Sequence, residues 1–168
     1  MSIKKIVKFG DPILRNPCKP VEVFNEELKS LIQDLKDTMY AAPGVGLAAN
    51  QIGISLQVAV VDISAGQEPS SLIILINPEI ILTEGEQFEE EGCLSIPGIY
   101  EKVRRPQKVI VKTMDFKGDF KEIEGEGLLA RAFCHEIDHL QGRLFVDYLS
   151  AFKLKYLKNK IEKIQKSV

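Results

Sequence analysis

The sequence predicts an α+β fold: antiparallel or mixed β-sheets packed around a central helix, with an N-terminal helix and a C-terminal amphipathic helix. Apolar residues recur at helical spacing between Asn25 and Pro43 and again over residues 150–165. Short β-branched stretches lie between them, and an apolar run over residues 127–141 follows these stretches. At 168 residues with 45% hydrophobic content, the chain is expected to form one domain over residues 1–168.

The N-terminal part should be an irregular segment, a helix and a short strand. Residues 1–24 carry three prolines and are expected to be irregular. Asn25 is a good N-cap for a helix that should end before Pro43-Gly44, because the residue before proline avoids helical geometry. Its inward face should consist of Leu28, Leu31, Ile32, Leu35 and Met39. Residues 44–51 are small and should be flexible, and a β-branched stretch follows over residues 56–63.

The second half should supply further strands and two helices. Residues 72–82 suggest two strands joined by a turn at Asn77-Pro78. Residues 108–114 and 120–124 are typical of a hairpin. An acidic stretch before them leads into a second small-residue segment over residues 91–98. The run over 127–141 should be the central helix, ended by Gly142 as its C′ residue. The last helix should point these residues inward: Phe152, Tyr156, Leu157, Ile161 and Ile164.

Composition excludes several classes of protein. A net charge of −2 gives no signature of nucleic-acid or membrane binding, so neither DNA nor a membrane is expected as a partner. The first residues lack the apolar run of a signal peptide, and no window approaches a membrane span. Three cysteines are an odd and sparse set, which favours free thiols or metal ligands in a reducing compartment. We therefore expect a cytoplasmic protein.

The pentapeptide His135-Glu136-Ile137-Asp138-His139 gives the central helix its chemistry. Residues four apart lie on one face of a helix, so His135 and His139 can bind the same metal ion. Glu136 lies near the open side of such an ion and can handle the proton of its water. The same letters can also occur on an ordinary helix, so the interpretation depends on a third ligand.

Spacing alone leaves the third ligand open. Phe145 occupies the position of the third histidine in one related motif and cannot bind a metal. Glu162 lies on a lysine-rich helix, where a solvated ion pair is the better interpretation. Cys93 lies between Gly92 and Leu94 and could complete a Cys-His-His set with one open position, although free cysteines often only pack. Cys134 points about 100° away from His135 on the helix and is a poor ligand.

Three segments together resemble the signature motifs of peptide deformylases. They are residues 44–51 (GVGLAANQ), residues 91–95 (EGCLS) and residues 135–139 (HEIDH), in matching order and separation. The similarity extends from the Asp11-Pro12-Ile13-Leu14-Arg15 segment to the Phe145-Val146-Asp147-Tyr148-Leu149 segment. The resemblance implies a single catalytic domain that removes the formyl group from N-formylmethionyl nascent peptides and releases formate. One difference is Cys134, where relatives often have glutamine.

The resemblance also implies the roles of individual residues. Cys93, His135 and His139 would bind the metal, and Glu136 would be the general base and acid. Gln51 and the backbone N–H of Leu94 would stabilise the oxyanion. The substrate would lie against these residues: Gly44, Val45, Gly46, Glu91, Gly92, Leu128, Arg131 and Ala132. Alone, Gln51 is typical of local backbone bonding and Leu128 of a core residue.

Metal and partners follow partly from the residues and partly from the resemblance. Nitrogen and sulfur ligands alone favour zinc, whereas the resemblance implies Fe²⁺, with Zn²⁺, Ni²⁺ or Co²⁺ as substitutes. The last helix carries six lysines against Glu162, a net charge of +5. Such a charged face is usually only solvated, but the resemblance implies docking on the ribosome through this end, and a basic helix suits ribosomal RNA. Two rival functions remain. One is a protease that cleaves internal peptide bonds, and the other is a non-enzymatic domain with a closed structural metal site in which Cys134 is the fourth ligand.

Overall fold

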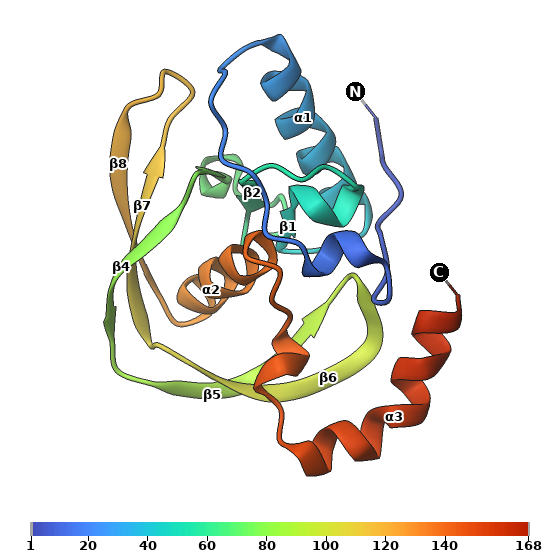
Figure 1. Cartoon of the computed structure of the whole chain (residues 1–168). Helices are drawn as coiled ribbons and strands as arrows, with labels where there is room; N and C mark the ends of the chain where they lie inside the picture. Colours follow the sequence, from blue (N-terminus) through green and yellow to red (C-terminus); the bar gives the residue numbers. More distant parts are fainter. Residues whose placement is uncertain (1, 168) are drawn as a thin grey trace.

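The computed structural model describes residues 2–167, and these form an α+β structure built around one helix, as predicted. In Figure 1, α2 (Leu128–Leu140) lies in the centre, with sheets on several sides of it. The described residues form three antiparallel sheets. The first consists of β1 (Gly46–Ala48), β2 (Val58–Val61) and β3 (Ile73–Ile76), and the second of β4 (Glu79–Glu84), β7 (Lys108–Met114) and β8 (Phe120–Glu126). The third consists of β5 (Gln87–Cys93) and β6 (Ile96–Arg105). Four short 3₁₀ helices connect the elements: η1 (Pro12–Arg15), η2 (Ala49–Ile52), η3 (Pro69–Ser71) and η4 (Phe145–Tyr148).

The N-terminal helix, α1 (Glu26–Ala41), has the predicted start and end. The side chain of Asn25 accepts a hydrogen bond from the backbone N–H of Leu28, which satisfies one of the free donors at the helix start. The predicted inward face packs on the first sheet, with Ile32 at its half-buried margin. The helix thereby supports the segment over residues 44–51, which follows it directly.

The central helix is held by a core from two sheets. Phe133, Ile137 and Leu140 of α2 pack with Leu75 of β3 and Val111 of β7 in one cluster. Each fully buried apolar side chain of this size stabilises the fold by about 1.5–3 kcal/mol relative to an exposed one. Because this cluster holds one side of α2, the other side is free to present polar residues to the remaining elements.

Three strands were missed by the sequence interpretation. Residues 87–93 and 96–105 form β5 and β6, where an acidic stretch and a small-residue segment were expected. Their pairing is antiparallel, with Gln87 opposite Arg105 and an irregularity between Glu91 and Cys93. Residues 46–48, expected to be flexible, pair with β2 as strand β1. Glycine and glutamate are poor strand formers, so here pairing in the folded protein overrides local propensity.

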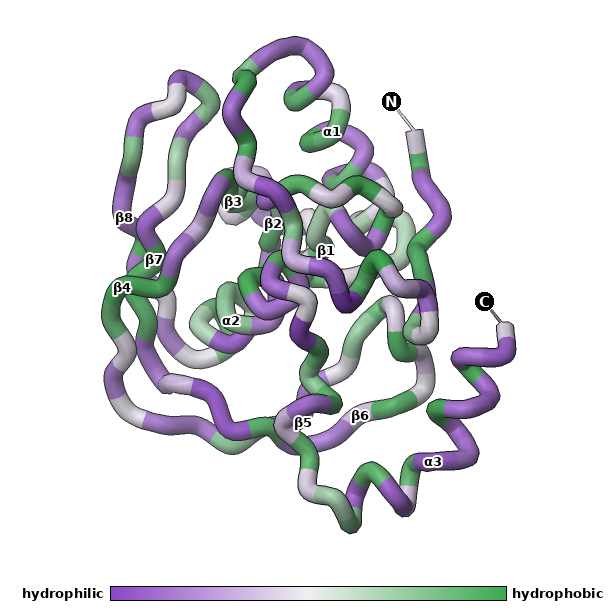
Figure 2. Tube along the Cα trace, in the orientation of Figure 1, coloured by the Kyte–Doolittle hydropathy of each residue, from purple (hydrophilic) through white to green (hydrophobic). Residues whose placement is uncertain are grey.

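The C-terminal helix, α3 (Ala151–Lys166), starts at the predicted N-cap Ser150 but its inward face was predicted wrongly in part. Phe152 and Tyr156 are 77% and 76% exposed. The face that packs on the body consists of Leu154, Leu157, Ile161 and Ile164. These residues are spaced by three and four, whereas Phe152 and Tyr156 are rotated about 100–140° from Leu157. Figure 2 shows hydrophobic and hydrophilic residues alternating along this helix at the edge of the molecule.

Candidate metal centre

Cys93, His135 and His139 come together although 42 residues separate the cysteine from the first histidine. Cys93 ends β5, and the histidines are one turn apart on α2. The Nε2 atoms of the two imidazoles are 3.2 Å apart, and Cys93 Sγ is 3.3 Å from His139 Nε2. Tetrahedral ligands about 2.0–2.3 Å from one ion lie roughly 3.3–3.6 Å from each other, so this spacing fits a single metal ion.

A buried network of ion pairs and hydrogen bonds contacts His135 at its Nδ1 atom. Glu91 Oε1 lies 2.8 Å from His135 Nδ1, which leaves Nε2 facing the other two ligand atoms. Arg105 donates two hydrogen bonds to Glu91, at 2.9 and 2.7 Å, and one of 2.7 Å to Asp138. Tyr148 donates a hydrogen bond of 2.7 Å to the same oxygen of Asp138. Such partners fix the tautomer and the orientation of a ligand imidazole.

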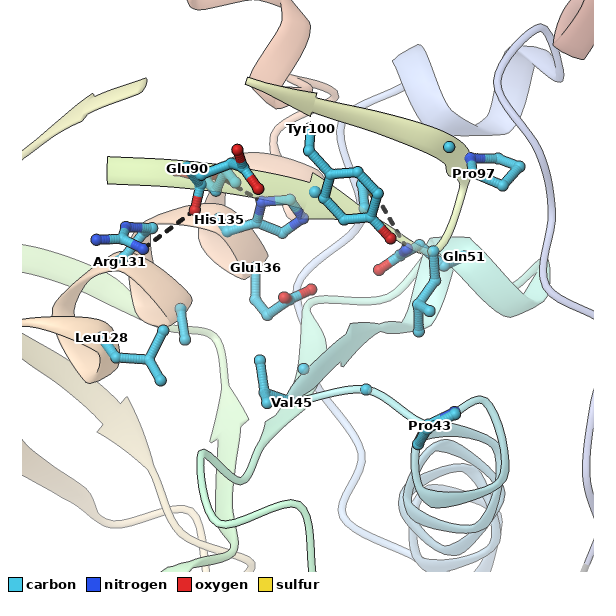
Figure 3. Close-up of a pocket in the computed structure, with 18 residues that line it drawn as sticks. Pro43, Val45, Gln51, Glu90, Pro97, Tyr100, Leu128, Arg131, His135 and Glu136 are labelled. Carbon is cyan, nitrogen blue, oxygen red and sulfur yellow. Dashed lines mark hydrogen bonds and ion pairs between the residues drawn. The ribbon is translucent and has the colours of Figure 1, made fainter. Parts of the chain in front are cut away.

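Glu136 lies on α2 beside the two histidines, and its carboxylate packs against β1. The side chain is almost fully buried, and its Oε1 has no hydrogen-bond partner among residues 2–167. A Cβ atom at position 46 would lie 2.5 Å from Glu136 Oε2, so a side chain there would displace this carboxylate. Figure 3 shows this carboxylate and the His135 ring directed into the pocket.

Gln51 reaches the same site from η2. Its Oε1 accepts a hydrogen bond of 3.0 Å from the backbone N–H of Ala48, which fixes the amide. Its Nε2 donates to Ser95 Oγ at 3.1 Å and points toward Cys93 Sγ at 3.7 Å. Leu94 lies in the turn between β5 and β6, and a Cβ atom on Gly44 would lie 2.9 Å from its Cδ1. The two small-residue segments therefore meet at the ligand atoms.

His139 is fully buried, whereas Gln51, Cys93, Leu94, His135 and Glu136 line one cleft of about 480 Å³. All eight residues predicted to contact substrate are on its walls, and their role in binding stays a prediction. The side chain of Arg131 is tied down by hydrogen bonds to Gln87 Oε1 and, at 3.2 Å, to the backbone oxygen of Glu90. In Figure 3 the apolar side chains of Val45 and Leu128 lie on the same side of the cleft.

The sequence interpretation missed several residues that line the cleft and most of the residues that hold the candidate metal ligands in place. Pro43, Glu90, Pro97, Gly98 and Tyr100 also line the cleft. Tyr100 packs so closely on Gly92 that a Cβ atom there would lie 2.5 Å from the ring. Once residues 96–105 are recognised as a strand, alternation places Tyr100 on a different face from Ile99, which is buried. No local signal points to Arg105, because its partners are distant in the sequence.

Burial and neighbouring charges shift the pKa values of the site's two carboxyl groups, Glu136 and Glu91, in opposite directions. Burial raises the pKa of Glu136 to about 7. At Glu91 burial also raises the pKa, but hydrogen bonds from Arg105 and His135 outweigh it and lower the pKa to about 2. Burial lowers the pKa of His139 well below its usual value. At His135 burial acts in the same direction, but the carboxylates of Glu136 and Glu91 and the Cys93 thiol outweigh it and raise the pKa.

The alternative ligands lie elsewhere. Phe145 is buried, and its ring stacks on that of His135 at 6.2 Å between centroids. Glu162 is 3.9 Å from Lys158 on the outer helix. Cys134 packs in the core around α2, and burial raises the pKa of its thiol to about 11. Two imidazoles and one thiol around an open cleft, beside a carboxyl group of raised pKa, define the class of metal-dependent hydrolases.

Comparisons with known proteins identify the particular family. The family model for polypeptide deformylase matches residues 3–155. The chain is 52% identical over 167 residues to the peptide deformylase of Acidobacterium capsulatum, which covers 99% of this chain and 98% of the relative. A peptide deformylase crystal structure from Legionella pneumophila superposes with a TM-score of 0.91 at 50% identity, covering 98% of this chain and 96% of that one. A plant peptide deformylase structure gives a TM-score of 0.94 at 38% identity, with 99% and 91% covered.

The chain belongs to the polypeptide deformylase family. It is therefore a metal-dependent enzyme that removes the N-formyl group from nascent peptides, as the three motifs predicted. Both rival functions, the protease and the non-enzymatic metal domain, are set aside by this assignment. None of the described helices is long and apolar enough to cross a membrane.

Proposed function

We propose that Cys93, His135 and His139 hold one divalent ion and that Fe²⁺ is the ion used in the cell. The support is the donor set and its spacing, with one side open to the cleft. The resemblance to iron-using enzymes favours Fe²⁺, and Zn²⁺, Ni²⁺ or Co²⁺ should bind the same three atoms. When bound, the ion supplies a water molecule of lowered pKa and polarises the formyl oxygen.

Glu136 is the proton carrier of the proposed reaction. The observation that carries this proposal is its buried Oε1, which has no hydrogen-bond partner among the described residues and belongs to a carboxylate in the same pocket as His135. A carboxyl group with a pKa of about 7 can both take and return a proton at neutral pH. Glu136 takes the proton of the attacking water and delivers it to the amine nitrogen as the formyl C–N bond breaks.

Gln51 and Leu94 stabilise the negative charge that develops on the formyl oxygen. The Gln51 amide is held in place through Ala48 and Ser95, so its Nε2 donor needs no reorganisation during the reaction. The backbone N–H of Leu94 lies in the adjoining turn and supplies the second donor. Removing one such donor typically costs about 10²–10³-fold in kcat.

The methionine side chain of the substrate occupies the apolar part of the cleft. Val45, Leu128 and Ala132 form this part, with Arg131 at its rim. The extended peptide runs between two glycine-containing segments, Gly44–Gly46 on one wall and Glu91–Gly92 on the other. Both segments can offer backbone groups because side chains are absent where the substrate passes.

The central experiment measures formate release from formyl-Met-Ala-Ser by protein that is prepared anaerobically with Fe²⁺. The wild-type protein should release formate, and a Glu136→Ala variant should lose at least about 10²-fold in kcat. Its bound iron is measured in parallel and should stay near one ion per chain. Cys93→Ser should instead lose the iron itself.

Full metal content without formate release by the wild-type protein would contradict the proposed site. An unchanged rate in Glu136→Ala would contradict only the role of that residue. Cleavage of an unformylated peptide at an internal bond would instead revive the protease alternative.

We also propose that α3 docks on the ribosome and that the enzyme works in the cytoplasm on emerging chains. Lys155, Lys160 and Lys163 form no ion pair among residues 2–167, so their charges are available to a polyanion. The exposed rings of Phe152 and Tyr156 lie on the same helix and can stack on unpaired bases. Free cysteines agree with a reducing compartment.

Ribosome docking is tested by co-sedimentation at increasing salt concentration. A triple variant with Lys155, Lys160 and Lys163 changed to glutamate should bind less, with a shallower salt dependence. A matched variant with Lys5, Lys117 and Lys121 changed to glutamate alters the same total charge at exposed sites elsewhere and should bind normally. Equal binding by the two variants would refute the proposal.

A further inference from the structure

Asn50 is fully buried between the two halves of the site, and its role is not explained by the chemistry above. It lies on η2, next to Gln51. Its Nδ2 donates a hydrogen bond of 2.7 Å to the backbone oxygen of His139, 89 residues further along the chain. A carbonyl oxygen only accepts hydrogen bonds, so the amide nitrogen must face it and Oδ1 must point the other way.

Two buried polar atoms of this pair lack partners. Asn50 Oδ1 and His139 Nδ1 have no hydrogen bond among residues 2–167, and both side chains are completely buried. An unpaired buried polar group destabilises the folded state. Asn50 Oδ1 is an acceptor. His139 Nδ1 becomes a donor when Nε2 of the neutral ring faces an ion, because the ring proton must then be on Nδ1.

The matching atom of His135 already has its acceptor. His135 Nδ1 lies 2.8 Å from Glu91 Oε1, whereas His139 Nδ1 has no equivalent partner among residues 2–167. Ligand histidines almost always donate their second ring N–H to a carbonyl, carboxylate or water. The asymmetry between the two histidines therefore needs an acceptor near His139, and Asn50 is the residue already bonded to its backbone.

We propose that Asn50 is a positioning residue for His139: it holds the backbone oxygen through Nδ2 and supplies Oδ1 as the acceptor for the Nδ1–H when a metal ion is bound. Through η2 the same side chain ties Gln51 to the end of α2, so the oxyanion donor and the metal ligand keep a fixed separation. This inference rests on the proposed metal site.

The first test is direct, because the chain has only two histidines. Protein labelled with ¹⁵N-histidine and loaded with diamagnetic Zn²⁺ should show two protected Nδ1–H protons. Asn50→Leu should speed solvent exchange of the His139 proton at least about 10-fold and leave that of His135 unchanged.

The second test measures transfer of Co²⁺ from the protein to a chelator. Asn50→Leu should release the ion about 10- to 100-fold faster than the wild-type protein. Asn50→Asp keeps Oδ1 as an acceptor but loses the Nδ2 donor to the His139 backbone oxygen, so its release rate should lie between those of Asn50→Leu and the wild type. The control is Thr113→Val, which loses two buried backbone contacts, at 2.8 and 3.1 Å to Ile76, and touches no ligand. It should lower the melting temperature without changing metal release.

The outcomes separate this inference from the proposed metal site. If Zn²⁺ does not shift both histidine spectra in the wild-type protein, the metal site itself is wrong. If it does, but Asn50→Leu leaves both His139 exchange and Co²⁺ release at wild-type rates, Asn50 is not a positioning residue. Exchange of the His139 Nδ1–H that is as fast in Asn50→Asp as in Asn50→Leu would overturn the acceptor role.

Discussion

Glu91 and Glu136 are the same residue type in one site, and their surroundings give them opposite properties. Glu91 accepts hydrogen bonds from Arg105 and lies against His135, so it stays ionised. Glu136 is equally buried, but its Oε1 has no partner among the described residues. Two titratable groups whose environments separate their pKa values are typical of acid–base sites. Here one carboxylate contacts the proposed metal ligand His135, and the other is suited to carry a proton.

Arg105 neutralises two buried carboxylates, and its removal should be costly. Arg105→Met leaves Glu91 and Asp138 without their cation, and breaking a buried ion pair in this way costs about 3–5 kcal/mol. Urea unfolding of the metal-free protein measures this loss. Arg104→Met is the control on the same strand: its partner Glu86 is 3.4 Å away and both are exposed, so little stability should be lost. Equal losses in the two variants would contradict the role of the network.

Asp62 gives the fold a pH dependence that is independent of the metal site. Burial raises its pKa, but hydrogen bonds from Ser64, Tyr40 and Gly66 outweigh burial and lower it below 3.8. A carboxyl group with a lowered pKa stabilises the folded state above its unfolded pKa, and this stability disappears as pH falls through the folded pKa. Asp62→Asn should therefore destabilise the protein at pH 7 and progressively less below about pH 4.

The comparison is made by denaturant unfolding at several pH values. Asp119→Asn, at an exposed position of the β7–β8 turn, should follow the wild-type curve throughout. A stability difference for Asp62→Asn that stays constant down to pH 2 would contradict this prediction.

At the scale of elements, the helices and strands that were predicted correctly are those that local sequence patterns determine. Helix α1 and the β7–β8 hairpin follow from Asn25, Pro43 and the Lys117-Gly118-Asp119 turn. Strands β5 and β6 could not be predicted, because acidic residues and glycines form strands here only through pairing with each other. The motifs pointed to residues that line the cleft and form the candidate metal centre, whereas Arg105 and Asn50 bind partners 14 to 89 residues away and leave no local signal.

The contact between β1 and α2 gives a prediction at this scale. Gly46→Ala places a methyl group against Glu136 Oε2, so the carboxylate must move. A displacement of about 1 Å in a catalytic group can cost 10²-fold in rate, and we expect kcat to fall by about that factor. Because Asp is one methylene shorter than Glu, Gly46→Ala should cost much less in a Glu136→Asp background. Additive effects in this double-mutant cycle would show that the glycine acts independently of Glu136.

At the scale of the whole molecule, α3 is joined to the site through one hydrophobic cluster. Leu157 packs with Ile99 and Val103 of β6 and with Phe145 of η4, and Phe145 stacks on the ring of His135. The C-terminal helix is thus both the proposed docking surface and part of the structure behind the metal ligands. Deleting it would remove both at once, which is why charge variants of its lysines test docking more cleanly.

The two faces of α3 can be separated by three alanine variants. Leu157 is 4% exposed, and Leu157→Ala should lower the free energy of unfolding by about 2–5 kcal/mol through the lost contacts and the cavity left behind. Phe152→Ala and Tyr156→Ala remove larger side chains that lie in solvent, so their unfolding curves should nearly coincide with that of the wild type. Denaturant unfolding measures all three. If Phe152→Ala destabilised the protein as much as Leu157→Ala, the helix would have to pack on the face that its sequence first suggested, with the two aromatic rings turned toward the body.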